Sequence, residues 1–141
     1  KYRPAGESGS VLVVEEDPSA SDLLRRTLEG EGWRVKVAQN GREALSQMDV
    51  EDPAIILLDL MMPEMDGFEF LSEIRSLPRA STVPVIVVTA KELTAAERSK
   101  LNGQVTTVLQ KGDYSRDELL SEIASKLGNR IRRTTQAEET H

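Results

Sequence analysis

Polar side chains capable of chemistry come directly after short apolar runs of this sequence. They are three consecutive acids, a further aspartate, a hydroxyl and a lysine: Glu15-Glu16-Asp17, Asp59, Thr89 and Lys111. If the runs are parallel strands, these side chains meet at the carboxyl edge of one sheet, where open parallel sheets bind their ligands. A solvated loop charge explains any one of them alone, but it is a poor explanation for all of them together. The sequence therefore predicts one site at this edge.

The chemistry that this set of side chains supports is phosphoryl transfer. Clustered carboxylates repel one another unless a cation lies among them, and a hard ion such as Mg²⁺ suits a site with only oxygen ligands. A carboxylate beside that ion can act as a nucleophile and form an aspartyl phosphate. A lysine ammonium, a threonine hydroxyl and backbone N–H groups of the loops after Asp59 and Thr89 can then bind the phosphoryl oxygens.

Two other chemistries of similar architectures do not fit the sequence. Phosphatases with a nucleophilic aspartate at a strand end resemble one another in a second aspartate two residues later, which acts as the general acid. Met61 stands at that position here. An FMN-binding flavodoxin needs a hydroxyl-rich phosphate loop after the first strand, and acids stand there instead.

The elements that must position these residues read as five strand–helix units. Five apolar or β-branched runs predict the strands: 11–14, 35–37, 54–58, 85–88 and 105–109. Several of them are apolar without alternation, which is typical of strands buried on both faces of a parallel sheet. A helix-start signal follows each run, for example Asp17-Pro18, or Asp66 three residues before Glu69. Strict alternation predicts an α/β fold with helices on both faces of the sheet.

Composition excludes several classes of function. The 141 residues suit one domain, and a net charge of −6 gives no general reason to bind nucleic acid or a membrane surface directly. There is no cysteine and the only histidine is His141, so a thiol or histidine catalytic centre is excluded. The apolar runs are too short to span a bilayer. The lack of cysteine fits a reducing compartment, and we expect the protein to be cytoplasmic.

Three segments and one lysine resemble the receiver domains of bacterial response regulators in two-component signalling. They are VLVVEEDP at 11–18, LLDLMMPEMDG at 57–67, VIVVTA at 85–90, and Lys111. The second segment has the proline four and the glycine eight residues after the aspartate. The resemblance covers about residues 10–127 and implies a single flavodoxin-like (βα)5 domain, doubly wound, with strand order 2-1-3-4-5. It leaves 1–9 and 128–141 as tails or linkers.

The resemblance also implies a role for each matching residue. Asp59 would be the phosphoacceptor, and Thr89 and Lys111 would bind the phosphoryl group. The implied Mg²⁺ ligands are Glu16, Asp59 and the backbone carbonyl of Met61, with Glu15 acting through water or by orienting the site.

The same resemblance implies the partners. A phosphohistidine in a histidine kinase or a histidine phosphotransfer protein would supply the phosphoryl group, and a downstream or linked output domain would receive the signal. Such a domain is not an enzyme in the usual sense, because it catalyses only its own Mg²⁺-dependent phosphorylation and dephosphorylation.

Three positions depart from the family pattern. Glu16 stands where aspartate is usual, so its carboxylate reaches roughly 1.5 Å further, which either retunes the metal site or is absorbed by rotamer choice. Val108 stands where the family has an aromatic switch residue, and Gly112 replaces the proline after the lysine. Val108 and Lys111-Gly112 resemble receivers embedded in hybrid sensor kinases. Glu16 and Val108 also leave a second interpretation open, a degenerate receiver that serves as a phosphorylation-independent protein-interaction module.

Overall fold

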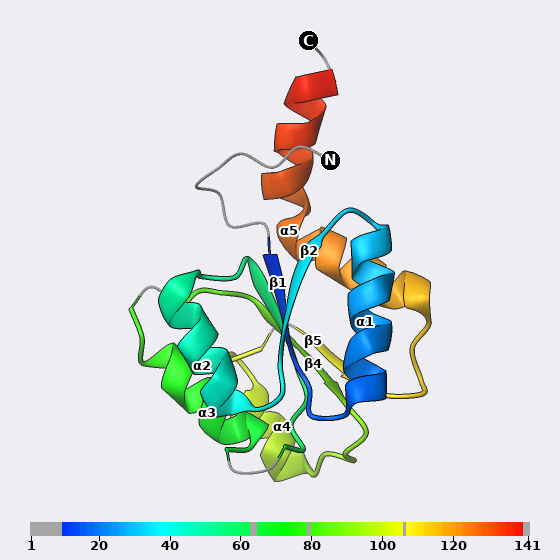
Figure 1. Cartoon of the computed structure of the whole chain (residues 1–141). Coiled ribbons are helices and arrows are strands. Elements are labelled where there is room, and N and C mark those ends of the chain that lie inside the picture. The colour runs from blue at the N-terminus through cyan, green and yellow to red at the C-terminus, as the bar shows by residue number, and fades with distance from the viewer. Residues whose placement is uncertain (1–9, 63–64, 79, 106, 140–141) are drawn as a thin grey trace.

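The computed structural model of this chain describes residues 10–62, 65–78, 80–105 and 107–139, with side chains up to residue 127. Strands and helices alternate along the described chain (Figure 1). The strands are β1 (Ser10–Val14), β2 (Arg34–Ala38), β3 (Ile55–Leu58), β4 (Val85–Thr89) and β5 (Thr107–Gln110). The helices are α1 (Pro18–Gly30), α2 (Gly41–Val50), α3 (Gly67–Arg75), α4 (Ala95–Leu101) and α5 (Arg116–Glu139).

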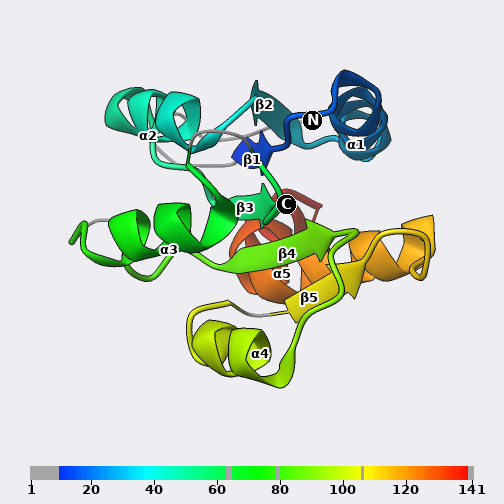
Figure 2. The same cartoon turned by 90° about the horizontal axis from the view of Figure 1, so that it is seen from below.

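The strands form one parallel sheet in the order β2-β1-β3-β4-β5, which confirms the predicted fold and strand order. The register pairs Val13 with Leu57 between β1 and β3, and Leu57 with Ile86 between β3 and β4. Because every strand runs the same way, all the carboxyl ends lie at one edge, toward the bottom of Figure 1, and in Figure 2 the arrows of β3, β4 and β5 point the same way. This is the edge on which the candidate site depends.

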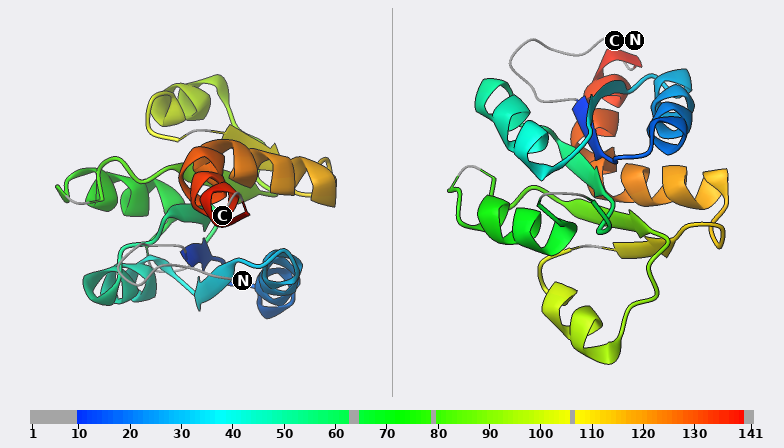
Figure 3. Two further views of the ribbon diagram at one scale, coloured as in Figure 1. Left: turned by 90° about the horizontal axis from the view of Figure 1, so that it is seen from above. Right: turned by 60° about the horizontal axis from the view of Figure 1, so that its bottom comes forward.

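Burial on both faces explains why the strands are continuously apolar. Alternate residues of β1 enter different cores: Leu12 and Val14 pack with α2, α3 and α4, whereas Val11 and Val13 pack with α1 and α5. The same alternation runs through β3 and β4. The end-on views show these two helical layers on opposite sides of the sheet (Figure 3). A polar side chain inside such a strand would lose its hydration on either face, and in β1, β3 and β4 the only polar residues stand at strand ends, Ser10 at the start of β1 and Thr89 at the end of β4.

The helix starts follow the capping signals of the sequence. Asp17 caps α1, with Pro18 as its first helical residue. Asp66 and Thr94 each form a reciprocal capping box, with Glu69 and Glu97 respectively. Each box satisfies backbone donors that the first helical turn leaves unpaired. The caps therefore fix where α1, α3 and α4 leave the site edge.

The last helix is longer than the sequence pattern indicated. α5 runs on to Glu139, past the expected end of the domain at residue 127, and its last turns project beyond the sheet (Figure 1). The expected N-terminal tail, 1–9, lies outside the described residues, and the division into domain and linkers stays a prediction. None of the described helices combines the length and apolarity needed to cross a membrane.

A single arginine braces two loops on the side of the sheet that carries α3 and α4. Arg75, the last residue of α3, donates from Nη1 to the carbonyl oxygens of Ser81 and Val83 at 3.0 Å each and of Ala80 at 3.4 Å. Its Nη2 donates to the carbonyl of Gln104, in the loop between α4 and β5. Burial lowers the pKa of Arg75, but guanidinium stays charged at any ordinary pH. It therefore joins the α3–β4 and α4–β5 loops as one unit.

We expect Arg75→Met to destabilise the domain, because methionine keeps much of the apolar stem but leaves several part-buried carbonyls without a donor. A loss of about 1–3 kcal/mol in the free energy of unfolding is expected for such groups. Urea unfolding at equilibrium measures it, provided the slope with denaturant stays that of the wild type.

Arg25→Met is the matched control. Arg25 pairs with Asp22 and Glu29 on the surface of α1, where its side chain is 38% exposed, and exposed ion pairs contribute about 0–1 kcal/mol. Equal losses for the two variants would contradict the bracing role of Arg75.

Candidate functional site

The carboxyl edge of the sheet brings together the residues that the sequence placed at separate strand ends. Glu15 follows β1, Asp59 follows β3, Thr89 ends β4, and Lys111 follows β5. Lys111 Nζ lies 2.7 Å from Glu15 Oε1 and 3.2 Å from Asp59 Oδ2, so one ammonium bridges two carboxylates. The predicted convergence of acids and lysine is therefore present for these three side chains.

The acids of this cluster are buried, and the lysine is the partly exposed member. Glu15 is 3% and Asp59 6% exposed, while the side chain of Lys111 is 27% exposed. Burial raises the pKa of Glu15 despite its hydrogen bonds to Lys111 and to the backbone N–H of Asp17. Burial alone would lower the pKa of Lys111, but the hydrogen bond to Glu15 and the charges of Asp59 and Glu15 outweigh it and raise that pKa. The lysine is thus held as a cation.

Backbone groups hold the Asp59 carboxylate in place. Its Oδ1 accepts from the backbone N–H of Met61 at 3.1 Å, and its own backbone N–H donates to the carbonyl of Val14 on β1 at 3.0 Å. One carboxylate oxygen is therefore fixed by the following loop and the other faces Lys111. This arrangement presents a restrained carboxylate beside a cation, which is what a nucleophile for phosphoryl transfer requires.

Thr89 connects the end of β4 to the loop that carries Lys111. Its fully buried side chain accepts at Oγ1 from the backbone N–H of Lys91 at 3.2 Å. The backbone carbonyl of Thr89 accepts from the N–H of Lys111 at 2.8 Å. Gln110 adds a second link, donating from Nε2 to the carbonyl of Lys91 at 2.8 Å. The β4–α4 loop and the β5–α5 loop are therefore hydrogen-bonded to each other beside the acids.

Glu16, an expected metal ligand, differs from its neighbour Glu15 in exposure. It is exposed, whereas its neighbour Glu15 is buried against Lys111. Among the described residues, no three acid or imidazole side chains are gathered closely enough to hold a metal ion. The donor chemistry still suits a hard cation, since the cluster contains oxygen ligands and its two carboxylates and one ammonium leave a formal charge of −1. The expected ligand roles of Glu16, Asp59 and Met61 stay predictions.

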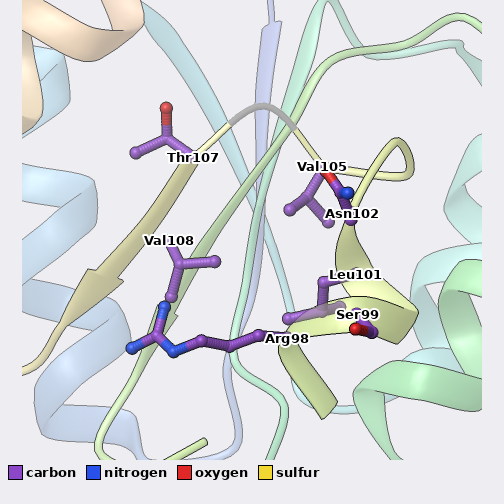
Figure 4. Close-up of a pocket in the computed structure, with 7 residues that line it drawn as sticks. All are labelled: Arg98, Ser99, Leu101, Asn102, Val105, Thr107 and Val108. Atoms are coloured by element: carbon purple, nitrogen blue, oxygen red, sulfur yellow. The ribbon is translucent and has the colours of Figure 1, made fainter. Parts of the chain in front are cut away.

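Val108, at the position of the family's aromatic switch, lies on β5 beside an open groove of about 480 Å³. The groove is lined from α4, the following loop and β5 by Arg98, Ser99, Leu101, Asn102, Val105, Thr107 and Val108 (Figure 4). Val108 packs only partly into the core. A small side chain thus stands at a surface hollow where an aromatic ring is usual in the family.

Gly112 solves the turn after the lysine in a way that proline could not. Its φ is +90°, in the region that glycine adopts freely and that proline, with φ near −65°, cannot reach. The glycine at this position is therefore required by the conformation of the loop after Lys111.

Sequence reasoning missed Tyr114. This phenol is half-buried against the core under α5, and burial raises its pKa. The charge of Lys111 lowers that pKa by a smaller amount, and the charge of Glu15 raises it. Its position three residues after Lys111, in the last strand–helix connection, was the available signal.

Gly67 closes the loop that starts at Asp59, and the structure shows why a larger residue does not fit there. A Cβ on Gly67 would lie 2.6 Å from Leu60 Cα and 3.1 Å from the carbonyl oxygen of Asp59. The Gly67 N–H donates to the carbonyl of Leu60 at 3.1 Å. The start of α3 therefore rests directly on the backbone next to Asp59.

Comparison with known proteins places the chain in a family of known fold. A family model described as response regulator receiver domain matches residues 11–124. An uncharacterized 14.6 kDa protein of Leptolyngbya boryana is 46% identical over 100 residues, which cover 68% of this chain and 76% of that protein. Response regulator MprA of Mycolicibacterium vanbaalenii is 34% identical over 125 residues, covering 89% of this chain but 51% of MprA. The chain thus spans about half the length of that relative.

A solved structure shows the same fold. The receiver domain of sensor histidine kinase PA1611 from Pseudomonas aeruginosa, with a magnesium ion coordinated in its active site cleft, superimposes with a TM-score of 0.77. It is 26% identical and the match covers 86% of this chain and 99% of that one. The chain belongs to the response regulator receiver domain family, whose members act in two-component signalling.

We expect Gly67→Ala to destabilise the domain by about 1–3 kcal/mol, as overpacking against rigid groups does, because the new methyl would meet backbone beside Asp59. Gly41→Ala is the matched control at the first residue of α2, where the new Cβ would meet the flexible thioether of Met65 at 2.8 Å. Chemical unfolding of both variants measures the difference, and a Gly41→Ala loss as large as that of Gly67→Ala would contradict the explanation.

Proposed function

We propose that this receiver domain takes a phosphoryl group from a phosphohistidine onto Asp59 and changes conformation in response. The observation that carries this proposal is the restrained carboxylate of Asp59, with one oxygen on the backbone N–H of Met61 and the other 3.2 Å from Lys111 Nζ. In the transfer, an Asp59 oxygen forms the new O–P bond as the N–P bond of the donor breaks, and the electron pair of that bond returns to the imidazole. Lys111 neutralises charge on the transferred group.

Thr89 is the proposed second contact for the phosphoryl group. Its hydroxyl ends β4 beside Asp59 in the sheet order and accepts a hydrogen bond from Lys91. The hydroxyl can donate its O–H to a phosphoryl oxygen while it still accepts from Lys91, so a movement of Thr89 toward that group would draw on the β4–α4 loop. The hydrogen bonds from Gln110 and Lys111 to this loop would pass the displacement on to β5.

Mg²⁺ is the proposed cofactor, held by Glu16, Asp59 and the backbone carbonyl of Met61, with Glu15 orienting the site. When bound, the ion would offset the negative charge of the carboxylates and of the incoming phosphoryl group. The magnesium ion in the cleft of the PA1611 receiver domain supports this assignment by similarity. Glu16 reaches the site only if its exposed side chain turns inward.

The proposed donor is a histidine kinase or a histidine phosphotransfer protein, and the proposed receiver of the signal is a downstream or linked output domain. The groove beside Val108 offers one surface for that contact. We place this activity in the cytoplasm, without direct contact to nucleic acid or membrane, and we assign no chemistry beyond the domain's own phosphorylation and dephosphorylation. The hybrid-kinase origin suggested by Val108 and Gly112 remains a hypothesis.

The exposure of Glu16 and the valine at position 108 favour a second candidate, a degenerate receiver that binds partners without phosphorylation. The restrained carboxylate of Asp59, with one oxygen on the backbone N–H of Met61 and the other facing Lys111, weighs against it, because it keeps the arrangement that a phosphoacceptor requires.

Incubation with acetyl phosphate and Mg²⁺ is expected to add one phosphoryl mass to the wild type and none to Asp59→Asn. Intact mass spectrometry measures the adduct. Asp113→Asn, an exposed acid two residues after Lys111, is the control and should be modified as the wild type is. A full adduct on Asp59→Asn would falsify the assignment, and no adduct on a folded wild type would favour the degenerate candidate.

Mg²⁺ is also expected to raise the melting temperature, because a ligand of the native state adds RT ln(1 + [L]/Kd), on the order of 1–3 kcal/mol at about 10–100 times Kd. Thermal melts of wild type, Glu16→Asp and Asp59→Asn test the ligand set, and Asp59→Asn should lose most of the effect. A Mg²⁺ response in Glu16→Asp but not in the wild type would identify the longer Glu16 as the defect. No response in either would contradict a metal site.

A further inference from the structure

The groove beside Val108 has an apolar lining at the surface of the domain. This lining consists of Leu101, Val105 and Val108, which pack with the core under α2, α3 and α4. Leu101 is 2% exposed, whereas the two valines are only partly buried. The volume of about 480 Å³ lies within the roughly 300–1,000 Å³ of sites that bind small molecules. The groove is therefore large enough for a small ligand that carries a ring.

One cation stands at this groove without a carboxylate partner. Arg98, in the middle of α4, is exposed, and its side chain extends from the helix in the direction of Val108 (Figure 4). Within the part of the chain that the structure describes, no acid forms an ion pair with Arg98, and the adjacent Glu97 pairs with Lys91 at 3.2 Å instead. A guanidinium offers five N–H donors in a planar fork that fits a carboxylate. The charge at the groove therefore favours an anionic ligand.

The other polar groups near the groove limit that ligand to a single acidic group at one end. Thr107 donates its hydroxyl proton to Glu122 Oε1 on α5 at 2.7 Å. The negative charge of Glu122 therefore disfavours an anion at the α5 end. Lys100, two residues after Arg98, lies 4.9 Å from the centroid of the Phe68 ring, on which its ammonium rests. A ligand with several carboxylates would thus find one matching cation, at the α4 end.

We infer that the groove binds a small monocarboxylate with an aromatic or alicyclic ring. Its carboxylate pairs with Arg98, and its ring rests on Leu101, Val105 and Val108. An arginine–carboxylate pair is frequently bidentate, which fixes the direction of the ligand. The ring fills space that valine leaves open at a position where an aromatic residue is usual in the family. This inference goes beyond the proposed function and does not depend on it, because none of these residues belongs to the acid and lysine cluster.

Titration of the ¹⁵N-labelled protein with 2-naphthoate, followed by ¹H–¹⁵N correlation spectra, tests the site. We expect saturable shifts of the amide signals of 98–105 and 107–108, with a Kd on the order of 0.1–1 mM for a ligand of this size. The neutral 2-naphthamide keeps the rings without the charge, and acetate keeps the charge without the rings. Each should bind about tenfold more weakly or less. A wild type without saturable shifts in these segments overturns the proposal.

Three variants locate the ligand. Arg98→Met keeps most of the stem and should weaken the binding of 2-naphthoate about tenfold or more. Lys100→Met makes the same change of net charge on the same helix and should leave the Kd nearly unchanged. Val108→Phe places a ring in the groove itself and should abolish the saturable shifts. Equal affinity of the wild type and Arg98→Met overturns the proposal, even if Val108→Phe does not fold.

A peptide separates a small ligand from a protein partner. Acetyl-Asp-Phe-Asp-amide carries two carboxylates and one ring, and we expect it to bind more weakly than 2-naphthoate because the groove has one cation for it. Saturable binding of this peptide to the same segments, without binding of 2-naphthoate, would assign the groove to a protein partner and overturn the small-ligand site.

Discussion

The ammonium of Lys111 between the carboxylates of Glu15 and Asp59 is the interaction on which the rest of this site depends. The two acids are almost completely buried and have therefore lost most of their hydration. Without a cation between them, their negative charges would also repel each other. Removing one partner of a buried ion pair typically costs about 3–5 kcal/mol. The lysine comes from a segment 96 residues from Glu15 and 52 from Asp59 along the chain. The fold must therefore bring three distant segments to one edge before the site exists at all.

The parallel sheet brings these segments together because its central strands exclude charged residues from their interior. β1, β3 and β4 are buried on both faces, with alternate side chains in two separate cores, so the strands themselves have little room for ionised groups. In these three strands ionised groups stand only beyond the strand ends, and the carboxyl ends of parallel strands lie together at one edge. The capped helix starts then lead the chain away before it can cover the edge. A charged cluster at this position follows from the same burial that stabilises the sheet.

Local patterns account for what could be predicted from the sequence. The strands and the caps at Asp17 and Asp66 depend on nearest neighbours and on apolar periodicity, whereas the strand order was implied by the resemblance. The structure confirms all of them. Which of Glu15 and Glu16 turns toward Lys111 could not be predicted in this way. It depends on the exact direction in which β1 ends and on the N–H of Asp17, which takes one oxygen of Glu15.

Arg75 shows a second limit of sequence reasoning. Its acceptors are backbone carbonyls of the α3–β4 and α4–β5 loops. Every residue has a backbone carbonyl, so the residue types in these loops do not indicate which carbonyls accept from Arg75. Long-range contacts between a side chain and distant backbone are therefore the class of interaction that residue patterns leave unseen.

The hydrogen bonds of Arg75 hold the loop that follows α4, so this helix is restrained at its C-terminal end. At its C-terminal end the helix passes into the loop that Arg75 ties through the carbonyl of Gln104, while its N-terminal end follows the loop of Lys91 beside the acids. A rod pinned at one end rotates when its free end is displaced. With seven residues at about 1.5 Å of rise each, the helix is roughly 10 Å long, so a displacement of about 1 Å at the free end corresponds to a tilt on the order of 6°. The pivot lies next to Leu101 and Val105, and such a tilt would therefore change the angle between the walls of the hollow beside Val108 more than its depth.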